Sequence, residues 1–88
     1  MSNPIYIYDQ IGGTGIQALD IVKEIAGEGD IDVHINSGGG SVSQGIAIYN
    51  SLKQHDGQVN VFVDGLAASI ASVIALAGDT VTMADLRK

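Results

Sequence analysis

The chain of 88 residues carries ten acidic and four basic side chains, for a net charge of −6, and 45% of its residues are apolar. This composition excludes a disordered segment, and the absence of a basic cluster argues against nucleic-acid binding, which needs grouped Lys and Arg. The absence of cysteine excludes disulfides, thiolate zinc sites and cysteine nucleophiles. Twelve glycines, about twice the usual share, stand in clusters along the chain.

The pattern of apolar side chains predicts strands and helices in alternation. Alternating or β-branched residues predict strands at 5–8, 31–36, 59–63 and 80–83. Helical spacing of apolar and small residues predicts helices at 16–26, 42–54 and 67–77. In the second helix, we expect the side that faces the core to carry Ile46, Ala47, Tyr49 and Leu52.

The predicted order, β-α-β-α-β-α-β with short connections, is typical of an α/β fold with a mainly parallel sheet and right-handed crossovers. At this length we expect a single domain over residues 1–88, ending in a polar tail at 85–88. The N-terminus lacks the parts of a signal peptide, and the longest apolar stretch, 66–78, is too short to cross a bilayer. A cytoplasmic location is therefore expected.

The turn before the first helix, from Gly13 to Ala18, fits the loose dinucleotide-binding pattern G-x-G-x-x-A. However, the acidic partner that such a site needs after the second strand is replaced by Asn36 and Ser37. We therefore expect a tight turn in which Thr14 helps to cap the helix, and no nucleotide site.

The turn after the second strand, Asn36 to Ser41, contains three consecutive glycines. Glycines are costly in chain entropy, but they allow positive φ, let a ligand approach closely and can present an N–H group to an anion. The turn is therefore either a built binding loop or a flexible connector that happens to be rich in glycine.

The turn after the third strand, Gly65 to Ser72, places Ser69 near the start of an apolar helix. As a nucleophile, Ser69 would have the helix dipole and the Ile70 N–H to stabilise negative charge. The alternative is a helix cap or a satisfied core hydroxyl. Because ligand-binding loops of a parallel sheet gather at the carboxyl ends of its strands, we expect Gly40 and Ser69 to be neighbours.

In this order, the motifs resemble the Clp protease proteolytic subunit family, with phage-type head-maturation proteases closest in overall style. The segments that carry the resemblance are Ile35–Val42, Gly45, Ile48-Tyr49, Gly65–Ser69 and Ala77-Gly78. The resemblance implies a ClpP/crotonase-like fold and a serine endopeptidase without a cofactor. It also implies protein or peptide substrates and a homo-oligomer, with an unfoldase or phage capsid proteins as further partners.

The resemblance assigns roles residue by residue. Ser69 aligns with the nucleophile, and the N–H groups of Gly40 and Ile70 align with the oxyanion hole. The loop that would pair with an extended peptide substrate comprises Gly38, Gly39, Ser41 and Val42. Gly38 stands where the family usually has proline, which loosens the loop because glycine does not fix φ.

A serine nucleophile needs a basic imidazole oriented by a carboxylate. The family has both downstream of the serine, and neither His34 nor His55 matches that histidine. We expect His34 to lie on a strand face, and His55 at a helix end where a cation suits the dipole. The chain is thus expected to be the N-terminal portion of a ClpP-like protease, inactive alone. Alternatives are a non-catalytic assembly module and, disfavoured by Ser69, a crotonase-type acyl-CoA-binding protein.

Overall fold

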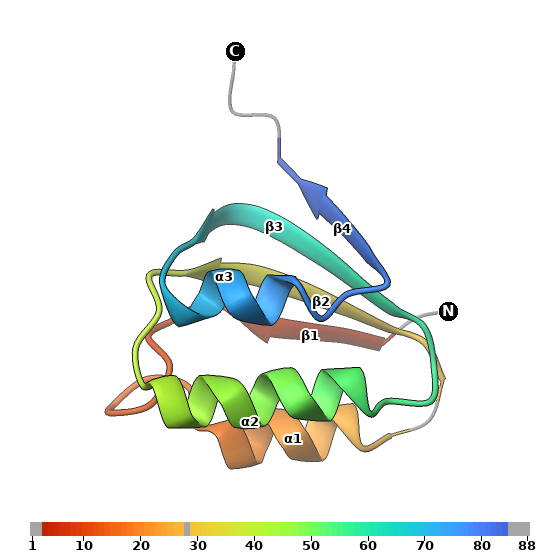
Figure 1. Cartoon of the computed structure of the whole chain (residues 1–88), viewed down its shortest axis with the longest axis horizontal. Coiled ribbons are helices and arrows are strands. Elements are labelled where there is room, and N and C mark those ends of the chain that lie inside the picture. The colour runs from red at the N-terminus through yellow and green to blue at the C-terminus, as the bar shows by residue number, and fades with distance from the viewer. Residues whose placement is uncertain (1–2, 28, 85–88) are drawn as a thin grey trace.

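The computed structural model describes residues 3–27 and 29–84, and the predicted polar tail at 85–88 lies outside them. Every predicted strand and helix is present, with shifted ends (Figure 1). The elements are β1 (Asn3–Ile7), α1 (Ala18–Ile25), β2 (Ile31–Ser37), α2 (Val42–Lys53), β3 (Val59–Ala67), α3 (Ile70–Ala75) and β4 (Thr80–Met83).

The four strands form one parallel sheet in the order β1-β2-β3-β4, which confirms the predicted α/β architecture. The register places Val33 between Ile5 on one side and Val61 on the other. Because right-handed crossovers between successive parallel strands place their helices on the same side, all three helices lie on one face of the sheet (Figure 1).

The core fills the space between the sheet and this helical layer. Alternate strand residues such as Ile5, Val33 and Val61 are 2% exposed or less, and they meet Ile21 and Ile74 from the helices. Burying a side chain of this size contributes about 1.5–3 kcal/mol. The period-2 pattern of the strands therefore identified the core face correctly.

The predicted inner side of α2 is partly wrong. Leu52 is buried and Tyr49 packs against the core, but Ile46 is 45% exposed and Ala47 is exposed as well. The buried line runs through Gly45, Ile48 and Leu52 instead. The helix turns this side inward because the side chain of Ile70 in α3 occupies the space beside Gly45.

The opposite face of the sheet carries aromatic side chains. The ring of His34 stacks between those of Tyr6 and Phe62, with centroid distances of 5.1 and 5.0 Å. Beside this stack, the Tyr8 hydroxyl and the His34 Nδ1 both hydrogen-bond the carboxylate of Asp64. His34 thus lies on a strand face, as predicted.

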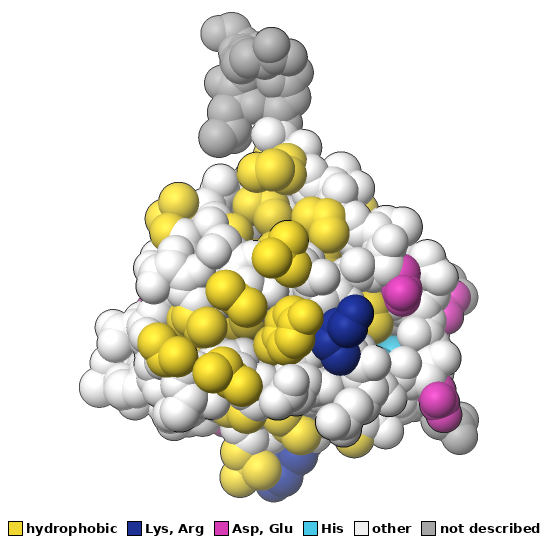
Figure 2. Space-filling view, in the orientation of Figure 1, with side chains coloured by type: hydrophobic (Ala, Val, Ile, Leu, Met, Phe, Trp, Pro, Cys, Tyr) yellow, Lys and Arg dark blue, Asp and Glu magenta, His cyan; other side chains and the backbone are white. Residues whose placement is uncertain are grey.

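Some apolar side chains of the helical layer and the edge strand face solvent. We call Ile46, Val73, Leu76 and Met83 the outer apolar patch, in which Leu76 and Met83 are each 71% exposed. Figure 2 shows hydrophobic side chains gathered on this face. Such exposure is typical of surfaces that another polypeptide covers. In the described part of the chain, no helix combines the length and apolarity needed to cross a membrane.

Candidate active site

The site begins where β2 and β3 leave regular pairing. Ile35 pairs with Val63 and Ser37 pairs with Ala67, so the single residue Asn36 on β2 faces three residues on β3. The Asn36 side chain fills this bulge, because its Oδ1 accepts a hydrogen bond of 3.0 Å from the Leu66 N–H. Bulges redirect the chain next to functional sites. This one carries the end of β3 across the glycine loop that follows β2.

Ser69 lies on a strained turn directly after β3. Its φ of 54° and ψ of −131° make it the one non-glycine residue with positive φ in the described ranges. A 3.0 Å bond from the Ala71 N–H to the Ala68 carbonyl closes a turn of type II′, in which this position favours glycine. Such a conformation costs about 1–3 kcal/mol and typically persists where function requires it.

The hydroxyl of Ser69 is available for chemistry. Ser69 is exposed, and its side chain does not cap α3, so the predicted alternative of a helix cap is wrong. The strained backbone explains this result, because a capping serine takes an extended conformation instead. A serine on a sharp strand-to-helix turn presents its Oγ outward, which is the geometry of a nucleophile.

The glycine loop lies directly against Ser69. Gly39 has a φ of +104°, and a Cβ added to it would lie 2.7 Å from the Ser69 Cβ and 3.3 Å from the Ser69 Oγ. Only glycine fits this approach, so the loop is a built part of the site. The two loops therefore meet at the carboxyl ends of the strands, as predicted, but Gly39 makes the contact with Ser69, whereas the predicted neighbour Gly40 lies against Ile11.

Hydrogen bonds to Ile11 fix the other side of the loop. The Ile11 N–H donates to the Gly39 carbonyl over 2.9 Å, and the Ser41 N–H donates to the Ile11 carbonyl over 2.8 Å. Since these bonds flank Gly40, its own N–H and carbonyl point away from Ile11. Within residues 3–27 and 29–84, the N–H groups of Gly40 and Ile70 donate to no protein acceptor.

A groove of about 350 Å³ lies beside this loop, lined by Gln10, Gly38, Gly39 and Gly40. Its walls are mostly backbone, which suits an extended peptide more than a ligand held by charged groups. Ser41 contributes differently, because its Oγ accepts a 3.3 Å bond from the Gln44 N–H and caps α2. Val42 follows as the first residue of that helix, with its side chain 57% exposed.

Thr14 does not cap α1, contrary to prediction. A 2.7 Å bond from the Ile16 N–H to the Gln10 carbonyl closes the turn early, so the helix begins later, after Gln17. The first helical N–H, that of Ala18, donates to the Gln44 Oε1 over 2.8 Å. A side chain of α2 thus occupies a donor that a bound pyrophosphate would need.

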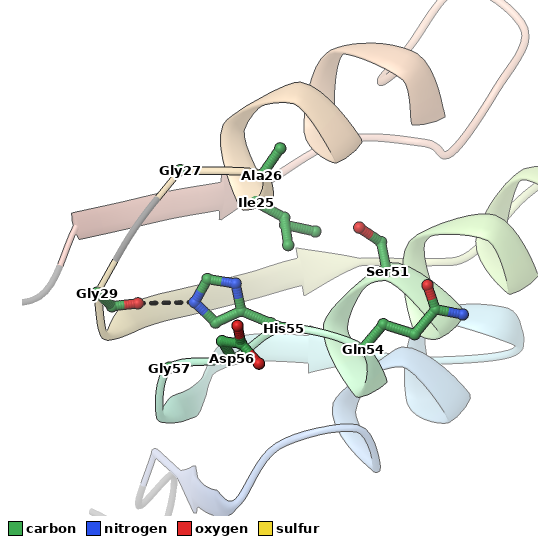
Figure 3. Close-up of a pocket in the computed structure, with 9 residues that line it drawn as sticks. All are labelled: Ile25, Ala26, Gly27, Gly29, Ser51, Gln54, His55, Asp56 and Gly57. Atoms are coloured by element: carbon green, nitrogen blue, oxygen red, sulfur yellow. Dashed lines mark hydrogen bonds between the residues drawn. The ribbon is translucent and has the colours of Figure 1, made fainter.

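Neither histidine hydrogen-bonds to Ser69. The His34 Nδ1 lies 2.9 Å from the Asp64 Oδ2 on the aromatic face. His55 follows the C-cap residue Gln54, and its Nε2 lies 2.7 Å from the Gly29 carbonyl. It borders a hollow of about 400 Å³ between the ends of α1 and α2 (Figure 3). The described residues contain no group of three or more metal-binding side chains.

The Tyr8–Asp64–His34 cluster makes stability depend on pH in the acid range. The Tyr8 hydroxyl, and then His34, hold the pKa of Asp64 below its ordinary 3.8. This cluster therefore stabilises the fold above that value, and the contribution disappears as pH falls through the lower folded-state pKa. Because Asp64 lies at the surface, we expect a small effect.

The test is a set of melting curves between pH 6 and pH 2 for the wild type and Asp64→Asn. The difference between the two melting temperatures should shrink as pH falls below about 4. A difference that stays constant across this range would contradict the assignment.

Comparison with known proteins identifies consistent relatives. Residues 4–87 match the sequence profile of the Clp protease family. The chain is 53% identical over 72 residues to the ATP-dependent Clp protease proteolytic subunit of Ligilactobacillus salivarius, which covers 82% of this chain and 36% of that protein. It is 47% identical over 47 residues to the same-named subunit of Pleurastrum terricola, which covers 53% of this chain and 24% of that protein.

The chain is also similar to solved structures of Clp proteases. ClpP1 from Listeria monocytogenes superposes with a TM-score of 0.76 at 30% identity, over 85% of this chain and 46% of that one. The ClpP protease catalytic domain from Plasmodium falciparum superposes with a TM-score of 0.76 at 30% identity, over 88% of this chain and 46% of that one. The chain thus spans roughly a quarter to a third of these curated relatives and less than half of these solved chains.

Proposed function

Because the chain belongs to the Clp protease family, we propose that it is the nucleophile-bearing part of a ClpP-like serine endopeptidase. The observation that carries this proposal is the conformation of Ser69. Its backbone is strained, its side chain does not cap α3, and it packs against Gly39. The relatives named as proteolytic subunits support peptide-bond hydrolysis as the reaction.

In the proposed mechanism, the Ser69 Oγ attacks the carbonyl carbon of the scissile peptide bond. Negative charge then develops on the carbonyl oxygen, and the N–H groups of Gly40 and Ile70 donate to it. Two observations support these donors: neither has a protein acceptor in the described ranges, and Ile70 starts α3 directly after Ser69. Removing one such donor typically slows catalysis by about 10²–10³-fold.

The substrate would lie as an extended strand in the groove beside the glycine loop. Gly38 and Gly39 line this groove, and their lack of side chains lets a peptide backbone approach. Ser41 and Val42 follow the groove residues in the chain, and Ser41 holds the end of the loop through its bonds to Ile11 and Gln44. This arrangement explains why the loop is built from backbone and small residues.

The proton of Ser69 must pass to a base, and we propose that this base and its carboxylate partner come from polypeptide outside these 88 residues. Both histidines of the chain are engaged elsewhere, His34 with Asp64 and His55 with Gly29. The chain alone is therefore inactive towards peptides under this proposal. Serine catalysis without an oriented imidazole loses several orders of magnitude in rate.

We further propose cytoplasmic assembly into a homo-oligomer that acts on protein substrates, with an unfoldase or phage capsid proteins as partners. The outer apolar patch supports assembly, since Leu76 and Met83 are each 71% exposed. The same patch supports the alternative of a non-catalytic assembly module of this fold. The two functions differ in whether Ser69 reacts.

A fluorophosphonate probe tests the proposal directly. We expect slow labelling confined to Ser69, located by peptide mass spectrometry, and faster labelling when free imidazole supplies the missing base. Ser69→Ala should not label, whereas Ser51→Ala, a serine on α2 beside the distant hollow, should label like the wild type. Labelling that persists in Ser69→Ala, or none even with imidazole, would contradict a serine nucleophile.

A further inference from the structure

Ser37 is the one buried polar side chain in the described part of the chain, at 3% exposed. Its hydroxyl donates a 2.8 Å hydrogen bond to the Asp9 carbonyl and accepts a 3.1 Å bond from the Gly39 N–H. The hydroxyl therefore links the segment after β1 to the glycine loop. A buried hydroxyl that donates one bond and accepts another in this way fixes the position of both of its partners.

We infer that Ser37 is a positioning residue that orients the peptide between Gly39 and Gly40, and thereby aims the Gly40 N–H. This inference rests on the proposed function, in which that N–H belongs to the oxyanion hole. Ser37 touches neither substrate nor reacting atoms in this account. It acts through the loop backbone alone.

The glycine loop needs such a restraint because of Gly38. A Cβ added to Gly38 would meet nothing within 4 Å, so no packing restrains the loop at this point. Glycine also leaves φ free, whereas a proline would fix it. The bond from the Gly39 N–H to the Ser37 Oγ closes a local serine turn across Gly38, which supplies the missing restraint.

The restraint acts together with the bonds to Ile11. The Gly39 N–H is held by Ser37, and the Gly39 carbonyl by the Ile11 N–H over 2.9 Å. With both groups fixed, the Gly39–Gly40 peptide has one orientation. Without the Ser37 hydroxyl, the Gly38–Gly39 peptide loses its restraint, and the bonds to Ile11 alone hold the Gly39–Gly40 peptide, so the direction of the Gly40 N–H is fixed less tightly.

Amide NMR of the full chain tests the restraint without any reference to activity. In Ser37→Ala, we expect hydrogen exchange at the Gly39 amide to accelerate up to about tenfold and the Gly40 amide signal to shift. If the alanine variant does not fold, Ser37→Cys takes its place. The thiol is similar in size to the hydroxyl but is a weak hydrogen-bond acceptor, so this variant should show the same two changes in the amide data. Ser37→Thr keeps the hydroxyl and should restore both signals.

Ile25→Val is the matched control, because it destabilises the core at the far end of α1 and should leave both loop amides unchanged. A folded Ser37→Ala or Ser37→Cys variant with wild-type Gly39 and Gly40 signals would overturn the inference.

Labelling kinetics then test the link to the site. With imidazole present, Ser37→Ala should lower the maximal fluorophosphonate labelling rate about tenfold, leave its concentration dependence unchanged, and regain the rate in Ser37→Thr. Changed amides with an unchanged labelling rate would overturn the positioning role. A wild-type chain that never labels would contradict the proposed function, and the amide data would still decide whether Ser37 orients the loop.

Discussion

Replacing Gly40 with alanine is expected to reduce the rate of imidazole-assisted labelling of Ser69 by at least about 100-fold, because it displaces the Gly40 N–H, one of the two proposed oxyanion donors. An added Cβ would overlap the Ile11 carbonyl oxygen and lie 2.9 Å from the Ile11 nitrogen. The φ of +141° is also unfavourable for alanine. The loop must therefore leave Ile11, and the Gly40 N–H moves with it. We expect a stability loss of about 2 kcal/mol or more.

Gly38→Ala provides the matched control for stability. It adds the same methyl group two residues away, where the added atom meets nothing within 4 Å. Its melting temperature should equal or slightly exceed that of the wild type, since alanine restricts the unfolded chain. If Gly40→Ala folds and labels as fast as the wild type, the Gly40 N–H is not an oxyanion donor.

Replacing Gly45 with alanine is expected to impair the site from a distance, through the packing of α2 against α3. The added Cβ would overlap the Ile70 Cγ1 and lie 3.1 Å from the Ile70 Cγ2. Ile70 is only 7% exposed and follows Ser69 directly, so α3 must shift and move Ser69 with it. Overpacking of this kind costs about 1–3 kcal/mol, partly offset by the better helix propensity of alanine.

Thermal melts and labelling rates check this prediction together. Gly45→Ala should melt below the wild type and label Ser69 about tenfold more slowly, as expected when a nucleophile is displaced. The double variant Gly45→Ala with Ile70→Ala removes the clash. Its loss of stability should therefore be smaller than the sum of the losses measured for the two single variants. A Gly45→Ala variant that is more stable than the wild type would show that helix propensity alone decides at this position.

Local patterns in the sequence were sufficient to predict the scaffold. Alternation identified strands such as 31–36 and 59–63, and the element order led to a parallel sheet. That topology in turn predicted that the glycine loop meets Ser69, with Gly40 as the expected neighbour where Gly39 makes the contact, because the carboxyl ends of parallel strands share one edge. These predictions depend only on periodicity and connectivity, which a sequence states directly.

Contacts between distant segments could not be predicted in this way. The inward side of α2 depends on Gly45, which has no apolar side chain to reveal that Ile70 packs beside it. The hydrogen bond between Asn36 and Leu66 joins residues 30 positions apart, and the bond between Ser37 and Asp9 joins residues 28 positions apart. Nothing in the local spacing of these polar residues identifies their partners.

Under the proposed function, Ser69 and the glycine loop of this chain form one part of a peptidase site, which becomes active when a base is supplied. The most direct measurement grafts the matching segment of this chain into the Ligilactobacillus salivarius subunit, which is 53% identical over 72 residues, and follows cleavage of a fluorogenic peptide. The chimera should hydrolyse the peptide, and its Ser69→Ala variant should lose at least about 10⁴-fold in rate. A folded chimera without activity, or full activity after Ser69→Ala, would contradict the proposed function.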